Sequence, residues 1–121
     1  MIFELTQEFF FDAAHTLERT IETDSSRRIH GHTYHVLVSL RGQPDPKSGM
    51  LMDLGYFRAT LAALRERLDH RFLDDIADIG PATLENLCAW VWRQLEAELP
   101  AIARVTVERR ASGDRCTLSA D

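Results

Sequence analysis

The fold is decided by the stretch HGHTYHVLVSLRG, residues 30–42. Apolar and polar residues alternate in it, which is the period of a strand that buries one face. The side chains expected on the buried face are Tyr34, Val36, Val38 and Leu40. His30 and His32 fall on the same face, so this strand carries two histidines in line with its apolar residues.

Outward from this strand, the preceding residues 2–14 are rich in Phe and Ile and predict a second strand that ends at Ala13-Ala14-His15. Residues 16–29 are polar and are interpreted as a long loop. Residues 43–49 contain two prolines and a glycine and predict another loop.

Two amphipathic helices are predicted in the second half of the chain. The first begins near Asp53, a good N-cap residue, and the second begins at Thr83, after the break at Gly80-Pro81. Their apolar stripes have helical spacing; they are Leu54, Phe57, Leu61, Leu64 and Leu68, then Leu84, Leu87, Cys88, Val91 and Leu95. Two final strands are expected on either side of a turn at residues 111–114.

The element order ββααββ predicts an α+β fold, in which an antiparallel four-stranded sheet carries two helices on one face. We interpret residues 1–121 as a single domain, since neither a repeat nor a linker divides them. Four strands leave two sheet edges, and edges are usually paired or covered. Pairing between subunits would close a larger, oligomeric barrel, so a homo-oligomer is expected.

The composition narrows the class of protein. The chain has 121 residues and a formal net charge of −5, which argues against a nucleic-acid-binding domain. Two cysteines are too few for a disulfide scaffold. Neither a signal peptide nor an apolar run of membrane-spanning length is recognisable. The expectation is a cytoplasmic protein with no nucleic-acid or membrane partner.

The histidines predict a metal centre. His30 and His32 project from one strand face, and His15 ends the neighbouring strand. If the two strands pair, the three imidazoles converge on one ion. Three histidines with an open fourth position are typical of catalytic zinc, whereas structural zinc sites fill all four positions. An isolated His-x-His is a weak signal by itself, and ordinary polar strand residues are the alternative.

A series of ordered motifs resembles the 6-pyruvoyltetrahydropterin synthase family over nearly the whole chain. The motifs are FDAAH at residues 11–15, HGH at 30–32, GMLMDL at 49–54, LDHRFL at 68–73, PATLEN at 81–86 and VE at 107–108. The resemblance implies the tunnelling fold (T-fold), in which sheets join around a trimer and two trimers usually stack. It also implies Zn²⁺ bound by His15, His30 and His32.

The resemblance further implies a lyase that acts on 7,8-dihydroneopterin triphosphate. The product would be 6-carboxy-5,6,7,8-tetrahydropterin, as in queuosine biosynthesis, or 6-pyruvoyl-tetrahydropterin. The short chain and the compact loop before His30 look most like the carboxy branch. Two alternatives stay open: a related zinc-dependent cleavage of a pterin side chain, and a pterin- or zinc-binding homologue without turnover.

The family pattern assigns roles to five more residues. Asp69 and His70 look like its acid–base pair, in which a carboxylate orients an imidazole that shuttles protons; a charge pair at a helix end is the alternative. Glu108 looks like the pterin anchor and a participant in proton transfer. Thr83 and Glu85 are expected to line the pterin pocket, although Thr83 equally fits a helix N-cap.

One position departs from the family pattern. Family members carry a cysteine four residues before HGH as the proton-abstracting base, and this chain has Ser26 there. A serine hydroxyl is far less acidic than a thiol, so it is no simple replacement. A glutamate three residues before HGH replaces the cysteine in another branch, but that position is Arg27 here.

Three explanations of Ser26 are open. The sequence is an engineered Cys-to-Ser variant, another group supplies the base, or the reaction is different or weakened. The candidate substitutes are Glu22, Asp24, His35 and Cys116. Arg27 and Arg28 are candidates for contact with triphosphate, with a solvated loop charge as the alternative.

Overall fold

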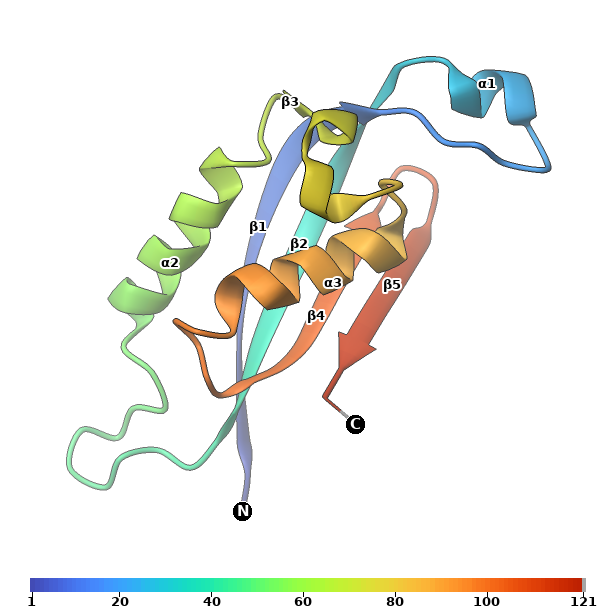
Figure 1. Cartoon of the computed structure of the whole chain (residues 1–121). Helices are drawn as coiled ribbons and strands as arrows, with labels where there is room; N and C mark the ends of the chain where they lie inside the picture. The colour runs from blue at the N-terminus through green and yellow to red at the C-terminus, as the bar shows by residue number, and fades with distance from the viewer. Residues whose placement is uncertain (121) are drawn as a thin grey trace.

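The computed structural model describes residues 1–120 and consists of one mixed sheet with two helices across one of its faces (Figure 1). The strands are β1 (Phe3–His15), β2 (His30–Gly42), β3 (Arg71–Phe72), β4 (Ile102–Arg109) and β5 (Asp114–Ser119). The helices are α1 (Thr23–Arg27), α2 (Leu54–Glu66) and α3 (Leu84–Leu95), with two 3₁₀ turns, η1 (Leu73–Asp75) and η2 (Ala77–Ile79).

The sheet has the strand order β3-β1-β2-β4-β5, and β1, β2, β4 and β5 pair antiparallel. The α+β fold and the four predicted strands are confirmed, but the four-stranded, wholly antiparallel sheet is corrected to five strands. The added strand β3 runs parallel to β1 and pairs only with Ala13 and Ala14. Two residues are too few to show an alternating pattern, which is why the sequence did not reveal it.

The two long helices begin where their capping residues predict. The Asp53 side chain accepts a hydrogen bond from the Tyr56 N–H (3.0 Å), and Thr83 accepts one from the Asn86 N–H (3.1 Å). The loop predicted at 16–29 contains the short helix α1, whose polar sequence has no apolar stripe. Among residues 1–120, no helix is long and apolar enough to cross a membrane.

The core lies between the helices and one face of the sheet. The strand residues Phe11, Tyr34 and Val36 are buried there against Phe57 of α2 and Val91 of α3. Since side chains alternate along a strand, the histidines that share the Tyr34 face lie on the helix side of the sheet. The core therefore holds the histidine-bearing ends of β1 and β2 in register.

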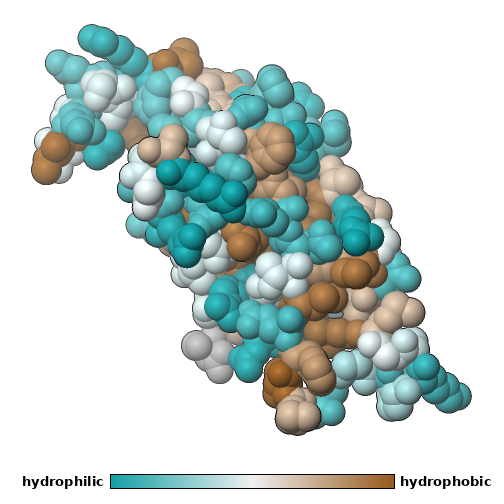
Figure 2. Space-filling view, turned by 180° about the vertical axis from the view of Figure 1, so that it is seen from behind, coloured by the Kyte–Doolittle hydropathy of each residue, from teal (hydrophilic) through white to brown (hydrophobic). Residues whose placement is uncertain are grey.

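The opposite face of the sheet carries no helix, and the view from behind shows polar side chains over much of it beside a band of apolar ones (Figure 2). Cross-strand pairs cover it, among them Thr6 with Ser39 (2.8 Å) and Thr106 with Thr117 (2.9 Å). Ion pairs join Glu4 to Arg104 and Glu8 to Arg110 on the same face. This face and the outer edge of β5 have no covering element among residues 1–120, which is consistent with the expected oligomer but does not test it.

Candidate metal centre

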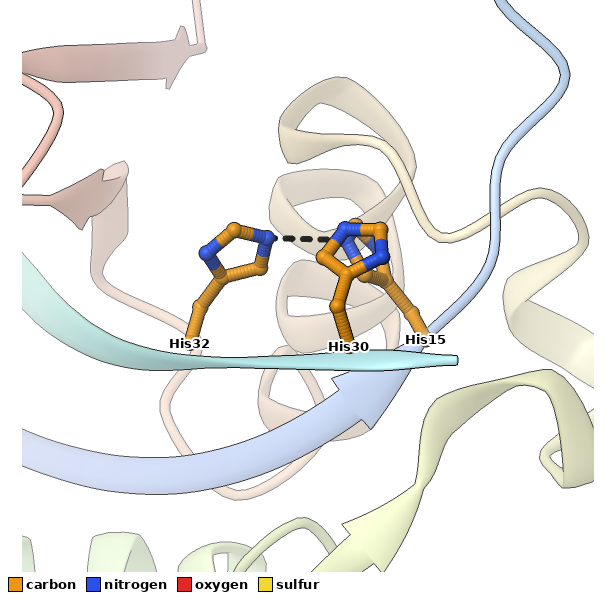
Figure 3. Close-up of side chains that lie close together, drawn as sticks. All are labelled: His15, His30 and His32. Carbon is orange, nitrogen blue, oxygen red and sulfur yellow. Dashed lines mark hydrogen bonds between the residues drawn. The ribbon is translucent and has the colours of Figure 1, made fainter. Parts of the chain in front are cut away.

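The register of β1 and β2 brings the three predicted histidines together. His15 lies directly opposite His30, and His32 lies opposite Ala13, the neighbour of His15 on the same face. One ring nitrogen from each histidine lies within 4.8 Å of the other two, and the Nε2 atoms of His15 and His32 are 3.0 Å apart (Figure 3). The prediction that the strands pair and the imidazoles converge is confirmed.

Backbone carbonyls orient two of the three rings. The Nδ1 of His15 lies 3.0 Å from the Ala82 carbonyl oxygen, and the Nδ1 of His30 lies 2.7 Å from that of Arg28. A carbonyl can only accept, so each Nδ1 carries the proton and each Nε2 keeps its lone pair. Outer hydrogen bonds of this kind fix the tautomer and orientation of metal-binding histidines.

The electrostatics favour the uncharged form of His15 and His32. Burial lowers the pKa of His15, and burial together with the charges of His15 and Arg109 lowers the pKa of His32 to about 4. Neutral imidazole is the form that binds metal. Three imidazole nitrogens with neither a thiolate nor a carboxylate among them match a catalytic zinc site with an open position.

Asp69 and His70 form the expected pair close to this centre. The Asp69 carboxylate accepts a hydrogen bond from the His70 Nδ1 at 2.9 Å and another from the Asp12 N–H of β1 at 3.0 Å. Both hydrogen bonds lower the pKa of Asp69, and the one from the Asp12 N–H contributes most. The Asp12 carbonyl in turn accepts from the His70 N–H at 2.6 Å.

His70 is held in an unusual backbone conformation, with φ of 58°. The left-handed region is costly for a residue with a Cβ, and the hydrogen bonds to Asp12 hold it there. The ring is exposed, and it lines a pocket of about 560 Å³ together with His32, Gly31 and Thr33. The structure thus places His70 beside the strand end that carries the metal-type histidines.

Glu108 lies on the other side of the sheet. It is paired with His35, whose side chain projects from the helix-free face, whereas its neighbour Val107 is in the core. The carboxylate is 3% exposed and is bound by Arg110 (3.2 Å) and Arg115. Burial opposes its ionisation, but the two guanidinium groups outweigh burial and lower the pKa of Glu108. Within one subunit the structure does not bring Glu108 to the histidines.

Thr83 and Glu85 begin helix α3. Thr83 caps the helix and borders a pocket of about 530 Å³ that also contains Ala82, whose carbonyl orients His15. The N-cap interpretation of Thr83 is confirmed, while its contact with pterin stays a prediction. Glu85 is exposed in the first turn of α3.

Ser26 is buried in helix α1, with 3% of its surface exposed. Its hydroxyl donates to the Thr23 carbonyl at 2.9 Å, and its own carbonyl accepts from the Leu17 N–H at 2.7 Å. Both polar groups are therefore engaged by neighbouring backbone. The residue therefore occupies a closed position in α1.

The proposed substitute bases lie elsewhere in the structure. Glu22 pairs with Arg19 on the surface, and Asp24 is exposed in α1. His35 lies on the helix-free face against the Phe10 ring, 5.8 Å between centroids. The backbone carbonyl of Cys116 on β5 accepts a hydrogen bond from the buried Cys88 thiol at 3.3 Å. None of the four belongs to the three-histidine group.

Two residues that contact the histidines were missed from the sequence. The Arg109 Nη1 lies 3.5 Å from the His32 Nε2, and the buried Tyr34 ring lies 5.7 Å from the His32 ring. Burial raises the pKa of Tyr34 to about 12. The signal for Arg109 was present, because alternation from Val105 and Val107 places it on the same face as the histidines.

Comparisons with known proteins identify the family of the chain. A family model described as 6-pyruvoyl tetrahydropterin synthase matches residues 4–120. The chain is 33% identical to a 6-carboxy-5,6,7,8-tetrahydropterin synthase from Synechocystis sp. over 84% of the chain and 81% of that protein. It is 31% identical to a 6-pyruvoyl tetrahydrobiopterin synthase from Pongo abelii over 80% of the chain and 77% of that protein.

The fold has a counterpart among solved structures. The structure of Caenorhabditis elegans 6-pyruvoyl tetrahydropterin synthase superposes with a TM-score of 0.83 and 26% sequence identity. The match covers 100% of this chain and 97% of that one. The similarity thus includes both long helices and all five strands.

Proposed function

The chain belongs to the 6-pyruvoyl tetrahydropterin synthase family, and from this premise we propose that it is a zinc-dependent lyase acting on 7,8-dihydroneopterin triphosphate. The proposed product is 6-carboxy-5,6,7,8-tetrahydropterin or 6-pyruvoyl-tetrahydropterin, the two branches that its curated relatives represent. The observation that carries the proposal is the convergence of one ring nitrogen from each of three histidines within 4.8 Å.

In this proposal His15, His30 and His32 hold the zinc ion. The metal supplies a Lewis acid for the hydroxyl and carbonyl oxygens of the substrate side chain. The two backbone carbonyls that bind the Nδ1 atoms of His15 and His30 keep the Nε2 atoms turned toward each other. The chain thus contributes a rigid donor set on two paired strands.

His70 is the proposed proton-transfer group. Asp69 accepts the hydrogen bond from Nδ1 and so keeps a proton on that atom, which leaves Nε2 as the free base. The backbone contact between Asp69 and Asp12 ties the pair to β1, the strand that also carries His15. Proton transfer by His70 Nε2 would therefore occur at a fixed position relative to the metal ligands.

Glu108 is proposed as the pterin anchor, through hydrogen bonds from the 2-amino group and the adjacent ring N–H. In the isolated subunit the Glu108 carboxylate forms ion pairs with Arg110 and Arg115, and the carboxylate faces away from the histidines. A pocket that unites these groups would need surfaces from more than one subunit. We therefore propose a homo-oligomer, a trimer or a dimer of trimers, with the pterin pocket between subunits.

A second candidate function follows from Ser26, whose hydroxyl is closed off in α1 and far less acidic than a thiol. Without a base at this position the protein would bind zinc and pterin without turnover, or cleave the pterin side chain by a different zinc-dependent route. The retro-aldol release of the side chain is one such route.

The deciding experiment is incubation of the zinc-loaded protein with 7,8-dihydroneopterin triphosphate, with products identified by mass. The expected result is release of triphosphate together with 6-carboxy- or 6-pyruvoyl-tetrahydropterin, abolished by a chelator and restored by zinc. A product that keeps the triphosphate would favour a different cleavage. Unchanged substrate that stays bound would favour the binding protein.

A further inference from the structure

A notch opens beside the histidine centre where β2 extends beyond β4. The pairing of these strands begins at His35 and Glu108, so Gly31, His32 and Thr33 have β1 on one side and no strand on the other. The turn between β4 and β5 faces this free edge. The pocket between them has a volume of about 480 Å³ and is lined by both groups of residues.

The notch is basic. Its positive charge comes from Arg109, the last residue of β4, and Arg110 in the turn that follows, and these face His32 and His35 of β2. Two side-chain nitrogens at this place, the Nε of Arg109 and the Nδ1 of His35, are buried without a hydrogen-bond partner among residues 1–120. A buried donor without an acceptor is costly, and a bound acceptor would remove that cost.

Two carboxylates face the notch, and together they do not use all the N–H donors of Arg109. Asp114 accepts from the Arg109 Nη2 at 3.0 Å, and Glu108 is bound to Arg110 at 3.2 Å. Arg109 still directs Nη1 toward the His32 Nε2 at 3.5 Å and keeps Nε unbound. Guanidinium groups suit the oxygens of a phosphate, and both Nη atoms of Arg109 carry a second N–H that can donate.

The surface arginines suggested from the sequence are less suited to this role. Arg27 pairs with Glu18 at 2.9 Å, and its side chain is 58% exposed. Arg28 is also exposed, and its carbonyl orients His30. Arg109 is the better placed cation because it is 19% exposed and contacts a histidine of the metal-type group.

We propose that the notch between the start of β2 and the β4–β5 turn binds the triphosphate group of the substrate, with Arg109 as its principal ligand. This inference rests on the proposed function for the identity of the ligand. An anion at Arg109 also balances charge, since a guanidinium next to a cation held by His32 would otherwise be repelled.

The test is calorimetric titration of the zinc-loaded protein with inorganic triphosphate and, separately, with 7,8-dihydroneopterin, which has no phosphate. Arg109→Gln should weaken triphosphate binding about 10- to 100-fold and leave the affinity for 7,8-dihydroneopterin unchanged. Arg104→Gln is the matched control, because Arg104 lies on the same strand but pairs with Glu4 on the helix-free face. It should bind triphosphate like the wild type.

A second variant distinguishes loss of the binding site from misfolding of the protein. Asp114→Asn removes the carboxylate that competes for Arg109 and should tighten triphosphate binding several-fold, a gain that damage to the fold cannot produce. The proposal is overturned if the wild type does not bind triphosphate or if Asp114→Asn gains nothing. It is equally overturned if Arg109→Gln weakens both ligands alike. Triphosphate binding requires no turnover, so these results are independent of whether the proposed reaction occurs.

Discussion

Replacement of His32 by alanine tests the metal centre most directly. His32 supplies one of three converging nitrogens, and its ring is only partly buried, so its removal leaves a shallow space at the strand end rather than a core cavity. His15 and His30 keep their carbonyl partners in the variant. The expected effect is therefore on zinc binding and not on the folded state itself.

The size of the effect on stability follows from the thermodynamic linkage between zinc binding and folding. Loss of an outer hydrogen-bond partner of a metal ligand already costs about 10- to 100-fold in affinity, so loss of a ligand should cost at least about 100-fold. At free zinc of about 100 times the wild-type dissociation constant, binding stabilises the wild type by about 2.7 kcal/mol and the variant by at most about 0.4 kcal/mol. For a domain of this size these values correspond to shifts in Tm of about 8–16 °C and about 1–3 °C.

The assay is thermal unfolding with and without zinc, together with metal analysis of the purified proteins. His35→Ala is the matched control, because His35 lies three residues further along the same strand on the opposite face. It should keep one zinc per chain and the full zinc-dependent shift. Full zinc occupancy of His32→Ala, or equal shifts in the two variants, would refute the three-histidine assignment.

Three further predictions concern the reaction and the assembly. Ser26→Cys should raise turnover about 10²- to 10⁴-fold without a change in zinc content, because a thiol is far more acidic than a hydroxyl; unchanged turnover would mean that this position is not the missing base. Asp69→Asn should lower kcat about 10²-fold or more while zinc content stays full, since the amide no longer fixes the proton on the His70 Nδ1; an unchanged kcat would remove the pair from the mechanism. Light scattering at micromolar concentration should show a trimer or a dimer of trimers, and a purely monomeric sample would contradict a pocket between subunits.

Strand alternation makes the grouping of the three histidines predictable from the amino-acid sequence. The face of β2 that buries Tyr34 also carries His30 and His32, and the antiparallel pairing with β1 leaves little freedom for His15. Periodicity along a strand and register between strands are both visible in sequence once the apolar positions are known. The convergence of the three histidines therefore follows from pattern, whereas their interpretation as zinc ligands depends on the family resemblance.

The contacts made by loops and short elements could not be predicted in this way. Strand β3 has two residues, and the left-handed conformation of His70 depends on hydrogen bonds to Asp12, which is distant in sequence. Backbone contacts of this kind have no residue-type signature. The resemblance identified Asp69 and His70 as a pair, but only the structure shows that β1 holds them beside the histidine-bearing strand ends.

The adjacent residues Glu108 and Arg109 show how one strand serves both faces of the sheet. Because side chains alternate along β4, Glu108 lies on the helix-free face and Arg109 lies on the histidine side. A continuous sheet would separate the two side chains, and no ligand could contact both. The sheet is not continuous here, because β4 does not pair with β2 beyond His35. The notch at this point is lined by His32 from one face and His35 from the other, and Arg110, which covers Glu108, lines it too. Gly31 adds no side chain at the free edge, and a Cβ built there would meet only the Ala13 carbonyl oxygen, at 3.6 Å. The histidine side and the Glu108 side of one subunit therefore meet at this strand end, where Gly31 adds no side chain.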